Sequence, residues 1–421
     1  MTLDAVYIVY WSLQDPLTQS QSLPVLRALA GHGYRMGLVT YERQPGDGAG
    51  PSRAVVSEKL RNQGIDWYPL LYHRDPPVLS TLWDVMKGLQ KCWSLHLSRG
   101  VSLFHARGTV PGAPAHLAAV ATGARFFYDA DGPLSQEYVD AGVWSEGSFG
   151  HRLARWSEDR FLRRADAVAV LTQTRRDVVQ PVVKRSVSVL PCAVDTSHFK
   201  PREEARTHLR SQLGLNGLVF VYAGKWGGWY AVEEMFDFVA IARETFPTSQ
   251  LLILTQESHE PFLQAARRRN IEHRLLIRTS SREEMPDYLC AADVGLSFVR
   301  PVPSKLACSP VKNGEYLACG LPVVTPTGIG DYSALIEKRK VGIVLDNLDT
   351  ENYRKAAQQL RGLLTDACLT ARCQDVARSE VGLSEVLVPR YLAIYEDLLG
   401  GPVKLCEQHT RDAAGFACNW K

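Results

Sequence analysis

The amino-acid sequence contains no apolar run of about 18 residues, the length that a membrane-spanning helix requires. Its first residues, MTLDAVYIVYW, include neither a basic segment nor a cleavage site, so we expect no secretory signal peptide. The formal net charge of +3 is close to balance, and no polybasic tail is present. These absences argue against membrane-spanning and nucleic-acid-binding proteins, and they favour a cytoplasmic location.

Motifs for metals, disulfides and nucleophilic catalysis are also missing. The nine cysteines are scattered without a C-x-x-C pair, which argues against a zinc site or a disulfide framework and favours free thiols in the core. The chain has no Ser–His–Asp set, no G-x-x-x-x-G-K-[ST] loop and no G-x-G-x-x-G after a strand. We therefore expect no metal and no cofactor.

Short apolar runs alternate with helical patterns along most of the 421 residues, a length that suits two domains. Runs such as AVYIVY (5–10) and LVFVYAG (218–224) lack polar alternation, as is typical of strands that are covered on both faces of a parallel sheet. Two series of such runs are separated by a polar stretch near 196–217. The pattern predicts an α/β protein with two Rossmann-like, doubly wound parallel sheets that face a cleft.

The stretch SPVKNGEYLACGLPVV (309–324) places Lys312 and Glu315 beside a short helical segment that Gly320 is suited to end. The spacing predicts that Glu315 lies in the first turn of this helix, beyond the carboxyl end of the strand DVGLSF (293–298). A helix N-terminus and a lysine favour phosphate, and a carboxylate can accept hydrogen bonds from a ribose diol.

Two further loops of the same predicted sheet follow strands and carry glycines and charged residues: Gly224, Lys225, Gly328, Gly330 and Asp331. Because ligands of open α/β sheets bind beyond the carboxyl ends of the strands, these loops and the 309–324 segment predict a nucleoside diphosphate site. In the alternative interpretation, Glu315 only stabilises a helix end, worth ~0.3–1 kcal/mol, and the glycines only form turns.

These motifs carry a family resemblance. The 309–324 stretch followed by GIGD resembles the donor-site signature of glycosyltransferase family 4, a group of retaining, two-domain enzymes with the GT-B fold. LPCAVDTSHFKP (190–201) resembles the interdomain motif of that family, with Cys192 and Ala193 in place of Asn-Gly. The resemblance spans most of residues 5–400. It implies a nucleotide-diphosphate sugar as donor, bound by Gly224, Lys225, Ser309, Lys312, Glu315, Gly328, Gly330 and Asp331.

The sequence departs from the family pattern in the donor site. The family has two glutamates eight residues apart; Glu315 matches the second, and Ala307 stands in place of the first. Similarity to a subgroup with S-P-x-K before E-Y-L-A implies that Lys312 serves the donor instead. Only Lys225 matches the usual pair of basic residues, and DPLTQSQS (15–22) replaces the glycine-rich loop after the first strand.

Polar residues also follow two strands of the first predicted sheet. LFHARG (103–108) presents His105 and Arg107, which we predict on the acceptor or phosphate side, although His105 can also be a satisfied strand-end histidine. Asp131 falls near the position where the family often has a histidine beside the transferred sugar. Asp131 can also be a turn residue, since it precedes a glycine.

The resemblance implies that Asp131, Lys225 and Lys312 are the catalytic groups. The stretch DAD (129–131) also matches a manganese-binding D-x-D pattern, but such short patterns arise by chance and we predict no metal there. The implied reaction is a metal-independent, retaining hexosyl transfer from a nucleotide-diphosphate sugar to an acceptor hydroxyl in glycan, polysaccharide or glycolipid biosynthesis. The alternatives are a nucleotide-sugar epimerase on the same fold and a non-catalytic nucleotide-sugar-binding protein.

The same resemblance implies an acceptor-side domain over 1–196 and a donor domain over 197–375, with C-terminal helices within 376–421 that return to the first domain before a loose tail from Pro402. The expected partners are a nucleotide sugar and a glycan or lipid-linked acceptor, without nucleic acid. A lipid-linked acceptor would add a peripheral membrane contact. The candidate surface for this contact is a basic helix face formed by Arg152, Arg155, Arg160, Arg163 and Arg164. In the alternative interpretation, this face is only exposed to solvent.

Overall fold

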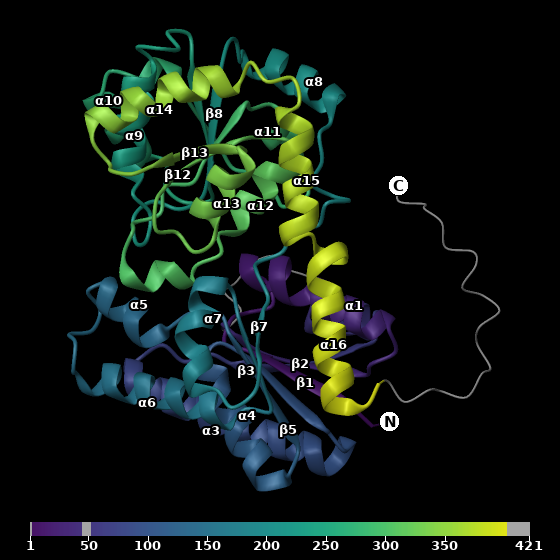
Figure 1. Cartoon of the computed structure of the whole chain (residues 1–421). Coiled ribbons are helices and arrows are strands. Elements are labelled where there is room, and N and C mark those ends of the chain that lie inside the picture. Colours follow the sequence, from purple (N-terminus) through teal and green to yellow (C-terminus); the bar gives the residue numbers. More distant parts are fainter. Residues whose placement is uncertain (1, 44–51, 402–421) are drawn as a thin grey trace, which may run out of the picture.

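The computed structural model describes residues 2–43 and 52–401, which form two α/β units, one above the other in Figure 1. The first unit contains a seven-stranded parallel sheet in the order β3-β2-β1-β4-β5-β6-β7. Its strands are β1 (Ala5–Val9), β2 (Met36–Glu42), β3 (Ile65–Leu71), β4 (Leu103–Arg107), β5 (Arg125–Ala130), β6 (Ala167–Val170) and β7 (Val187–Val189).

The second unit contains a six-stranded parallel sheet in the order β10-β9-β8-β11-β12-β13. Its strands are β8 (Val219–Ala223), β9 (Gln250–Leu254), β10 (Leu275–Arg278), β11 (Val294–Leu296), β12 (Val323–Pro326) and β13 (Gly342–Leu345). In both sheets the strand order reverses beside the first strand, between β1 and β4 and between β8 and β11. This is the doubly wound arrangement, and the predicted fold class is confirmed.

The strands that lack polar alternation are covered by helices on both faces. All residues of β1, β4 and β8 are buried. Two hydrophobic clusters flank the first sheet, and helices complete both of them. One layer contains α1 (Leu23–Gly31), α2 (Arg53–Arg61) and α16 (Val388–Leu399); the other contains α3 (Pro77–Arg99), α4 (Thr109–Thr122) and α6 (Phe149–Arg164).

The second sheet is covered in the same way. Its first cluster includes α9 (Val232–Ala242), α10 (Glu260–Arg268) and α14 (Thr350–Leu363). Its second includes α11 (Met285–Cys290), α12 (Val311–Ala318), α13 (Tyr332–Arg339) and α15 (Leu369–Val381), with α8 (Glu203–Leu213) packed against it.

The C-terminal helices connect the two units. α15 packs on α12, whereas α16 packs on α1 beside the first sheet (Figure 1). The chain passes between them at Gly382, and there it meets the other interdomain connection: the backbone N–H of Val194 donates to Val381 O at 2.9 Å, and that of Leu383 donates to Val194 O at 2.9 Å. The two connections therefore run side by side.

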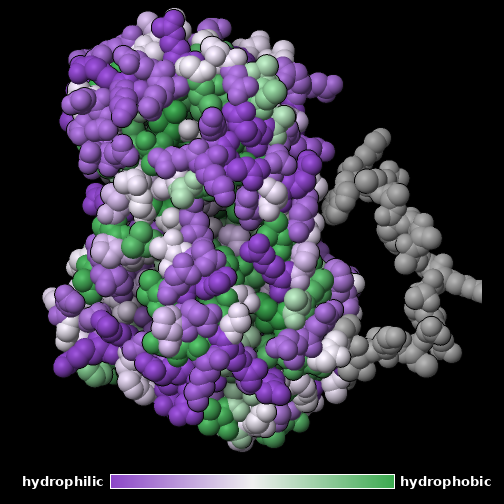
Figure 2. Space-filling view, viewed as in Figure 1, coloured by the Kyte–Doolittle hydropathy of each residue, from purple (hydrophilic) through white to green (hydrophobic). Residues whose placement is uncertain are grey.

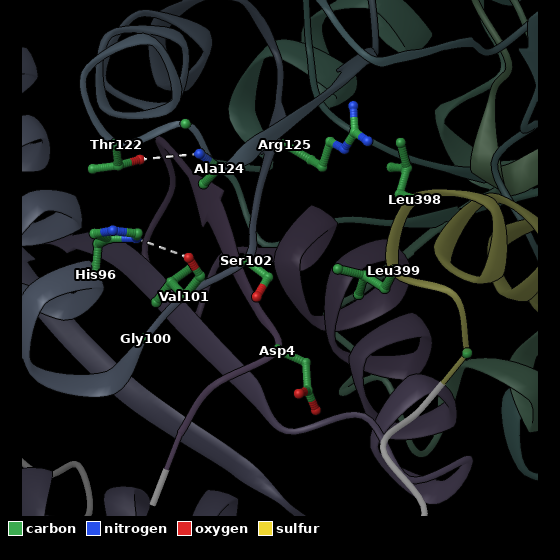
Figure 3. Close-up of a pocket in the computed structure, with 12 residues that line it drawn as sticks. Asp4, His96, Gly100, Val101, Ser102, Thr122, Ala124, Arg125, Leu398 and Leu399 are labelled. Carbon is green, nitrogen blue, oxygen red and sulfur yellow. Dashed lines mark hydrogen bonds between the residues drawn. The ribbon is translucent and has the colours of Figure 1, made fainter.

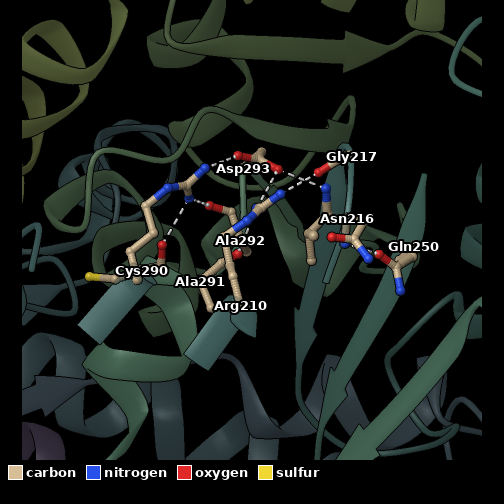
Figure 4. A network of polar contacts seen from close by, with 10 residues as sticks. Arg210, Asn216, Gly217, Gln250, Cys290, Ala291, Ala292 and Asp293 are labelled. Atoms are coloured by element: carbon tan, nitrogen blue, oxygen red, sulfur yellow. Dashed lines mark hydrogen bonds and ion pairs between the residues drawn. The ribbon is translucent and has the colours of Figure 1, made fainter. Parts of the chain in front are cut away.

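An arginine network fixes α8 to the amino edge of the second sheet (Figure 4). Arg206 donates to the carbonyl oxygens of Cys290 and Ala292 and pairs with Asp293 at 2.6 Å. Arg210 also reaches Asp293, at 3.1 Å, and the same carboxylate accepts from the backbone N–H of Val219 at the start of β8. The helix that follows the linker is thereby tied to β8, an inner strand of the second sheet.

None of the helices in the described part of the chain combines the length and apolarity needed to cross a bilayer. The tail predicted from Pro402 onward lies outside the described residues.

Candidate active site

The reversal of strand order between β8 and β11 marks the edge of the second sheet where ligands of this fold class bind. α12 begins there, at Val311, directly after Pro310, and Gly320 follows its end with a φ of 83°. The predicted first-turn position of Glu315 is wrong. Proline is well suited to a helix start, so the helix begins earlier than predicted, with Lys312 in its first turn and Glu315 one turn further along.

Lys312 is buried without a hydrogen-bonding partner. The residue is 8% exposed, and its Nζ donates a hydrogen bond to no carboxylate or carbonyl oxygen of the described residues. The ammonium lies over two aromatic rings, 4.2 Å from the centroid of Tyr222 and 4.3 Å from that of Tyr230. Burial lowers the pKa of Lys312 to about 7, against the opposing effect of Glu315. An anionic ligand would relieve the cost of this unpaired cation.

Two predicted donor-site residues follow β8. A Cβ at Gly224 would lie 2.8 Å from the Nζ of Lys312, so a larger residue there would displace this ammonium. Lys225 is exposed, and its carbonyl oxygen accepts a hydrogen bond from the hydroxyl of Tyr222 at 2.7 Å. The loop after β8 and the start of α12 therefore place one accessible cation, Lys225, and one buried cation, Lys312, at the same sheet edge.

Glu315 lies between two cations. It is 9% exposed, and its Oε1 is 3.6 Å from Nη1 of Arg282. Burial raises the pKa of Glu315, while the charges of Arg282 and Lys312 oppose that rise. A carboxylate held in this way can accept hydrogen bonds from a ligand that enters beside α12.

The loop between β12 and α13 requires its glycines. Gly328 and Gly330 have φ angles of 76° and 50°, in the left-handed region that glycine tolerates. A Cβ at Gly330 would collide with the carbonyl oxygen of Cys308 in the segment before α12. The two loops of the predicted donor site are thus in direct contact.

Asp331 ends this loop, and its carboxylate reaches the first domain. It accepts hydrogen bonds from the backbone N–H of Gln173 at 2.6 Å, the backbone N–H of Thr174 at 3.1 Å and the Thr174 hydroxyl at 2.9 Å. These groups form the start of α7 (Gln173–Val179), so Asp331 caps a helix of the other domain. Ser309 makes a second link, since its Oγ accepts from the backbone N–H of Cys192 at 3.1 Å.

A further contact joins the domains at α5 (Leu134–Asp140) and η4 (Pro303–Ala307). Lys305 pairs with Glu137 at 2.7 Å, and the backbone N–H of Ser304 donates to Asp140 at 2.8 Å. Both elements follow strands of their sheets, as do α7 and the Asp331 loop. The carboxyl edges of the two sheets therefore face each other (Figure 1).

Arg107, at the end of β4, has its anionic partner inside the protein. Nη1 of Arg107 donates to Oδ2 of Asp129 at 2.9 Å, and the hydroxyl of Tyr391 on α16 donates to the same oxygen at 2.6 Å. Burial alone would lower the pKa of Arg107, but the charge of Asp129 raises it well above the usual value. The structure thus uses Arg107 to hold α16 on the first sheet, and an acceptor or phosphate contact stays a prediction.

His105 belongs to the same buried cluster. It is fully buried, stacks on Phe127 with ring centroids 4.1 Å apart, and its Nδ1 is 2.9 Å from the hydroxyl of Tyr395. Burial lowers its pKa, which favours the neutral ring. His105 therefore presents no surface to an acceptor in this arrangement, although its Nε2 is buried without a hydrogen-bonding partner, and its role stays a prediction.

Asp131 follows β5 and lies beside the start of α4. A Cβ at Gly108 would be 3.1 Å from its Oδ1, and Gly108 has a φ of 94°. Burial raises the pKa of Asp131 to about 7, although Arg107 opposes the rise. The carboxyl group is thus at the facing edge of the first sheet and can exist in either protonation state near neutral pH.

Metal binding has little support among the described residues, which contain no group of three or more His, Cys, Asp or Glu side chains arranged for a metal ion. In the DAD stretch, Asp129 is already engaged by Arg107 and Tyr391. Metal independence itself stays a prediction.

A surface recess lies at the opposite, amino edge of the first sheet (Figure 3). Its charged residues already have partners: Asp4 pairs with Arg35 at 2.9 Å, and Arg125 pairs with Asp166 at 3.0 Å. The buried, unpaired cation of Lys312 distinguishes the facing edges from this recess.

Three residues of the site were not predicted: Tyr222, Tyr230 and Arg282. Tyr222 lies in an apolar run that indicates only a core strand, and Arg282 is far from Glu315 in the sequence. The one available signal was the loop YAGKWGGWY, whose two terminal tyrosines flank the predicted Gly224 and Lys225.

Two family models match the chain. Residues 20–193 match the glycosyl transferase 4-like domain, and residues 217–366 match the glycosyl transferases group 1 domain. None of the curated proteins matches it.

Solved structures share the fold at low sequence identity. Sucrose-phosphate synthase from Thermosynechococcus elongatus aligns with a TM-score of 0.72 and 18% identity, covering 94% of this chain and 99% of that chain. Anabaena HepE in complex with UDP aligns with a TM-score of 0.70 and 16% identity, covering 94% and 100%. WaaG, described as a glycosyltransferase involved in lipopolysaccharide biosynthesis, aligns with a TM-score of 0.67 and 15% identity, covering 94% and 100%. With its two matching domains in sequence and this fold, the chain belongs to the family 4-like glycosyltransferases with the GT-B fold.

Proposed function

We propose that this glycosyltransferase moves a hexosyl unit from a nucleotide-diphosphate sugar to an acceptor hydroxyl, with retention of configuration and without a metal ion. The observation that carries the proposal is the buried ammonium of Lys312, which has no hydrogen-bonding partner and lies at the start of α12. A diphosphate would supply the missing anion, and the free N–H groups of the first turn of α12 would bind it as well.

The residues of the second domain would act on the leaving group. Lys312 and Lys225 would neutralise the charge that grows on the diphosphate as its bond to C1 of the sugar breaks. Glu315 would accept hydrogen bonds from the ribose hydroxyls, and the backbone at Gly328 and Gly330 would lie against the donor.

Asp131 would act from the first domain. The acceptor oxygen would form the new bond to C1 while its proton passes to the departing diphosphate oxygen, and the transition state carries positive charge on the sugar ring. The ionised form of Asp131 would balance that charge or hold a sugar hydroxyl. Its raised pKa means that both forms are present near neutral pH.

The structural relatives suggest where to look for substrates. HepE structures contain UDP and, separately, UDP-glucose, which supports a uridine nucleotide sugar as the first donor to test. The description of WaaG supports an acceptor that is a glycan or a lipid-linked glycan, within glycan, polysaccharide or glycolipid biosynthesis. A peripheral membrane contact would bring the enzyme to a lipid-linked acceptor.

Nucleoside diphosphates should first be screened by thermal shift, because a ligand at 100 times its Kd stabilises the folded protein by about 2.7 kcal/mol. Nucleotide sugars that bind should then be incubated with candidate acceptors in a chelator, and the products analysed by NMR. Release of nucleoside diphosphate with a retained anomeric configuration supports the proposal. Isomerised sugar would indicate an epimerase, and binding without turnover a non-catalytic protein.

The role of Glu315 can be tested separately. Glu315→Ala should weaken binding of UDP about tenfold or more, as expected when a hydrogen bond to a charged group is lost. It should have little effect on 2′,3′-dideoxy-UDP. Glu337→Ala, on the exposed side of α13, is the matched control. Equal losses for both nucleotides would contradict the assignment to ribose.

A further inference from the structure

Helix α3 exposes large apolar side chains along its outer face. Seven of them are between 43% and 71% exposed: Val78, Leu79, Leu82, Trp83, Met86, Trp93 and Leu97. Their spacing of mostly three or four residues places them in one stripe along the helix. Exposed apolar residues scattered singly are normal, but a contiguous stripe of this size indicates an interaction surface.

The inner face of α3 is apolar only in part. Its buried residues include Ser80, Asp84, Gly88 and Cys92, and Leu95 is its one large buried apolar side chain among the described residues. Asp84 accepts a hydrogen bond from the hydroxyl of Tyr10 at 2.7 Å, and a Cβ at Gly88 would collide with the hydroxyl of Tyr41. A surface helix normally turns most of its large apolar side chains to the core, whereas α3 exposes more of them than it buries. The outer stripe is therefore not explained by the packing of this chain.

The neighbouring helices of the same layer extend this apolar surface. α4 packs on α3, and α6 packs on α4. α4 exposes Leu117 and Val120, and α6 exposes Phe149 and Trp156. In the view of Figure 2, the second domain is mostly purple, whereas green side chains are spread over the first domain.

Basic residues accompany the apolar ones. On α3, the Nζ of Lys87 lies over the Trp83 ring at 4.8 Å. On α6, the guanidinium of Arg160 lies over the Trp156 ring at 5.6 Å. Further exposed arginines of α6 are Arg152, Arg155, Arg163 and Arg164.

Acidic residues on these three helices are few. Asp84 and Glu158 are buried, so that Asp159 is the one exposed acidic residue in α3, α4 and α6 as the structure describes them. The layer therefore combines apolar side chains, three exposed tryptophans and an excess of positive charge. This combination is typical of helices that lie in the interface of an anionic bilayer.

We propose that the outer surface of α3, α4 and α6, hereafter the α3–α4–α6 face, docks on an anionic membrane surface. Positive charge decides between a membrane and a second copy of the chain. A symmetric dimer through this face would bring the same basic surface against itself, whereas anionic lipid headgroups would neutralise it. The inference deepens the peripheral contact named under the proposed function, but it does not require the transfer reaction, because docking needs neither donor nor acceptor.

Vesicle flotation with the full chain tests this proposal. The vesicles are phosphatidylcholine alone, or phosphatidylcholine in which about one third of the lipid is replaced by phosphatidylglycerol. The chain should bind the anionic vesicles and dissociate as salt is raised. Trp83→Gln/Trp93→Gln/Leu97→Gln should weaken binding at least tenfold. The matched control is Val55→Gln/Val178→Gln, which changes exposed valines of α2 and α7 and should bind as the unaltered chain does.

The charges are tested by Lys87→Gln/Arg152→Gln/Arg155→Gln. Each removed cation should weaken binding to anionic vesicles about fivefold, equivalent to about 1 kcal/mol, with little effect on phosphatidylcholine vesicles. The thermal shift that UDP produces should be the same in all variants as in the unaltered chain. Membrane binding and nucleotide binding are thereby tested independently. Failure of the unaltered chain to bind anionic vesicles would overturn the proposal. So would a dimer, measured by light scattering, that the tryptophan variant dissociates.

Discussion

Both domains bury charged side chains at the carboxyl edge of a parallel sheet, but they compensate those charges differently. In the first domain, Arg107 is paired with Asp129, and Tyr391 donates to the same carboxylate. In the second, the ammonium of Lys312 has two aromatic rings beside it and no hydrogen-bonding partner, and the nearest cation to Glu315 is 3.6 Å away.

The difference separates a structural cluster from the proposed ligand site. A buried ion pair is part of the fold, and removing one partner leaves an uncompensated charge. A buried charge without a partner costs stability in the free protein and favours an incoming counter-ion. Substitutions in the first cluster should therefore act on stability, and those at Lys312 on ligand binding and turnover.

The largest effect is expected for Arg107→Met. It leaves the buried carboxylate of Asp129 without its cation and should lower the free energy of unfolding by about 3–5 kcal/mol, measured by urea denaturation. Arg107→Met/Asp129→Asn should regain much of this loss. The control is Arg125→Met, at an exposed ion pair with Asp166, which should cost less than about 1 kcal/mol. If both arginine substitutions lower the free energy of unfolding by similar amounts, the Arg107–Asp129 pair is not a special contribution to the stability of the first domain.

Lys312→Met should reduce turnover and leave stability unchanged or higher, the opposite of what is expected for the first cluster. Turnover should fall by about 10²–10³-fold, the range observed when one preorganised charge stabiliser is removed. The free energy of unfolding should stay the same or rise, because an unpaired buried cation is replaced by an apolar side chain of similar length. Lys338→Met, on the exposed side of α13, controls for the loss of a surface charge. Near-normal turnover with reduced stability would assign Lys312 to the fold.

The pH dependence of UDP binding tests whether the charge of Lys312 contributes to that binding. Because the pKa of Lys312 is lowered to about 7 in the free protein, its charge is present below that pH and lost as the pH rises through it. Affinity for UDP should therefore fall above pH ~7, by about tenfold per unit until other groups titrate.

Isothermal titration calorimetry over this range measures the effect. Lys312→Met should show weak binding without the step. Asp131→Asn should keep the step, since the other carboxyl group with a pKa of about 7 belongs to the first domain. If the fall in UDP affinity above pH ~7 disappears in Asp131→Asn but persists in Lys312→Met, the titrating group is Asp131 and not Lys312.

The smallest effect is expected at the contact between the domains. Asp331→Asn removes one acceptor oxygen from the start of α7 and should cost about 1 kcal/mol of stability, the usual value of a helix cap. It should also loosen the two domains, seen as a larger radius of gyration in solution scattering. Asp349→Asn, which weakens a cap within the second domain, should cost a similar amount without changing the scattering.

The sequence predicted the two sheets because buried parallel strands leave a local signal, the uninterrupted apolar run. It also predicted Lys312, Glu315 and the glycine loops, whose residue types and spacing are local. It did not predict that Tyr222 and Tyr230 would enclose Lys312, that Asp331 would cap α7, or that Tyr391 would reach Asp129. These contacts depend on how distant segments meet, and no spacing along the chain encodes them.

The position of α16 has a consequence for the order in which the two domains can fold. The helix lies in the core of the domain that contains β1, so the last described helix completes a domain whose first strand is Ala5–Val9. During synthesis, the second domain can fold before Tyr391 and Tyr395 of the first domain's core have been synthesised. A chain ending at Gly382 should therefore keep the unfolding transition of the second domain and lose that of the first. Synthesis begins with the first domain, but we expect the folding of that domain to be completed last.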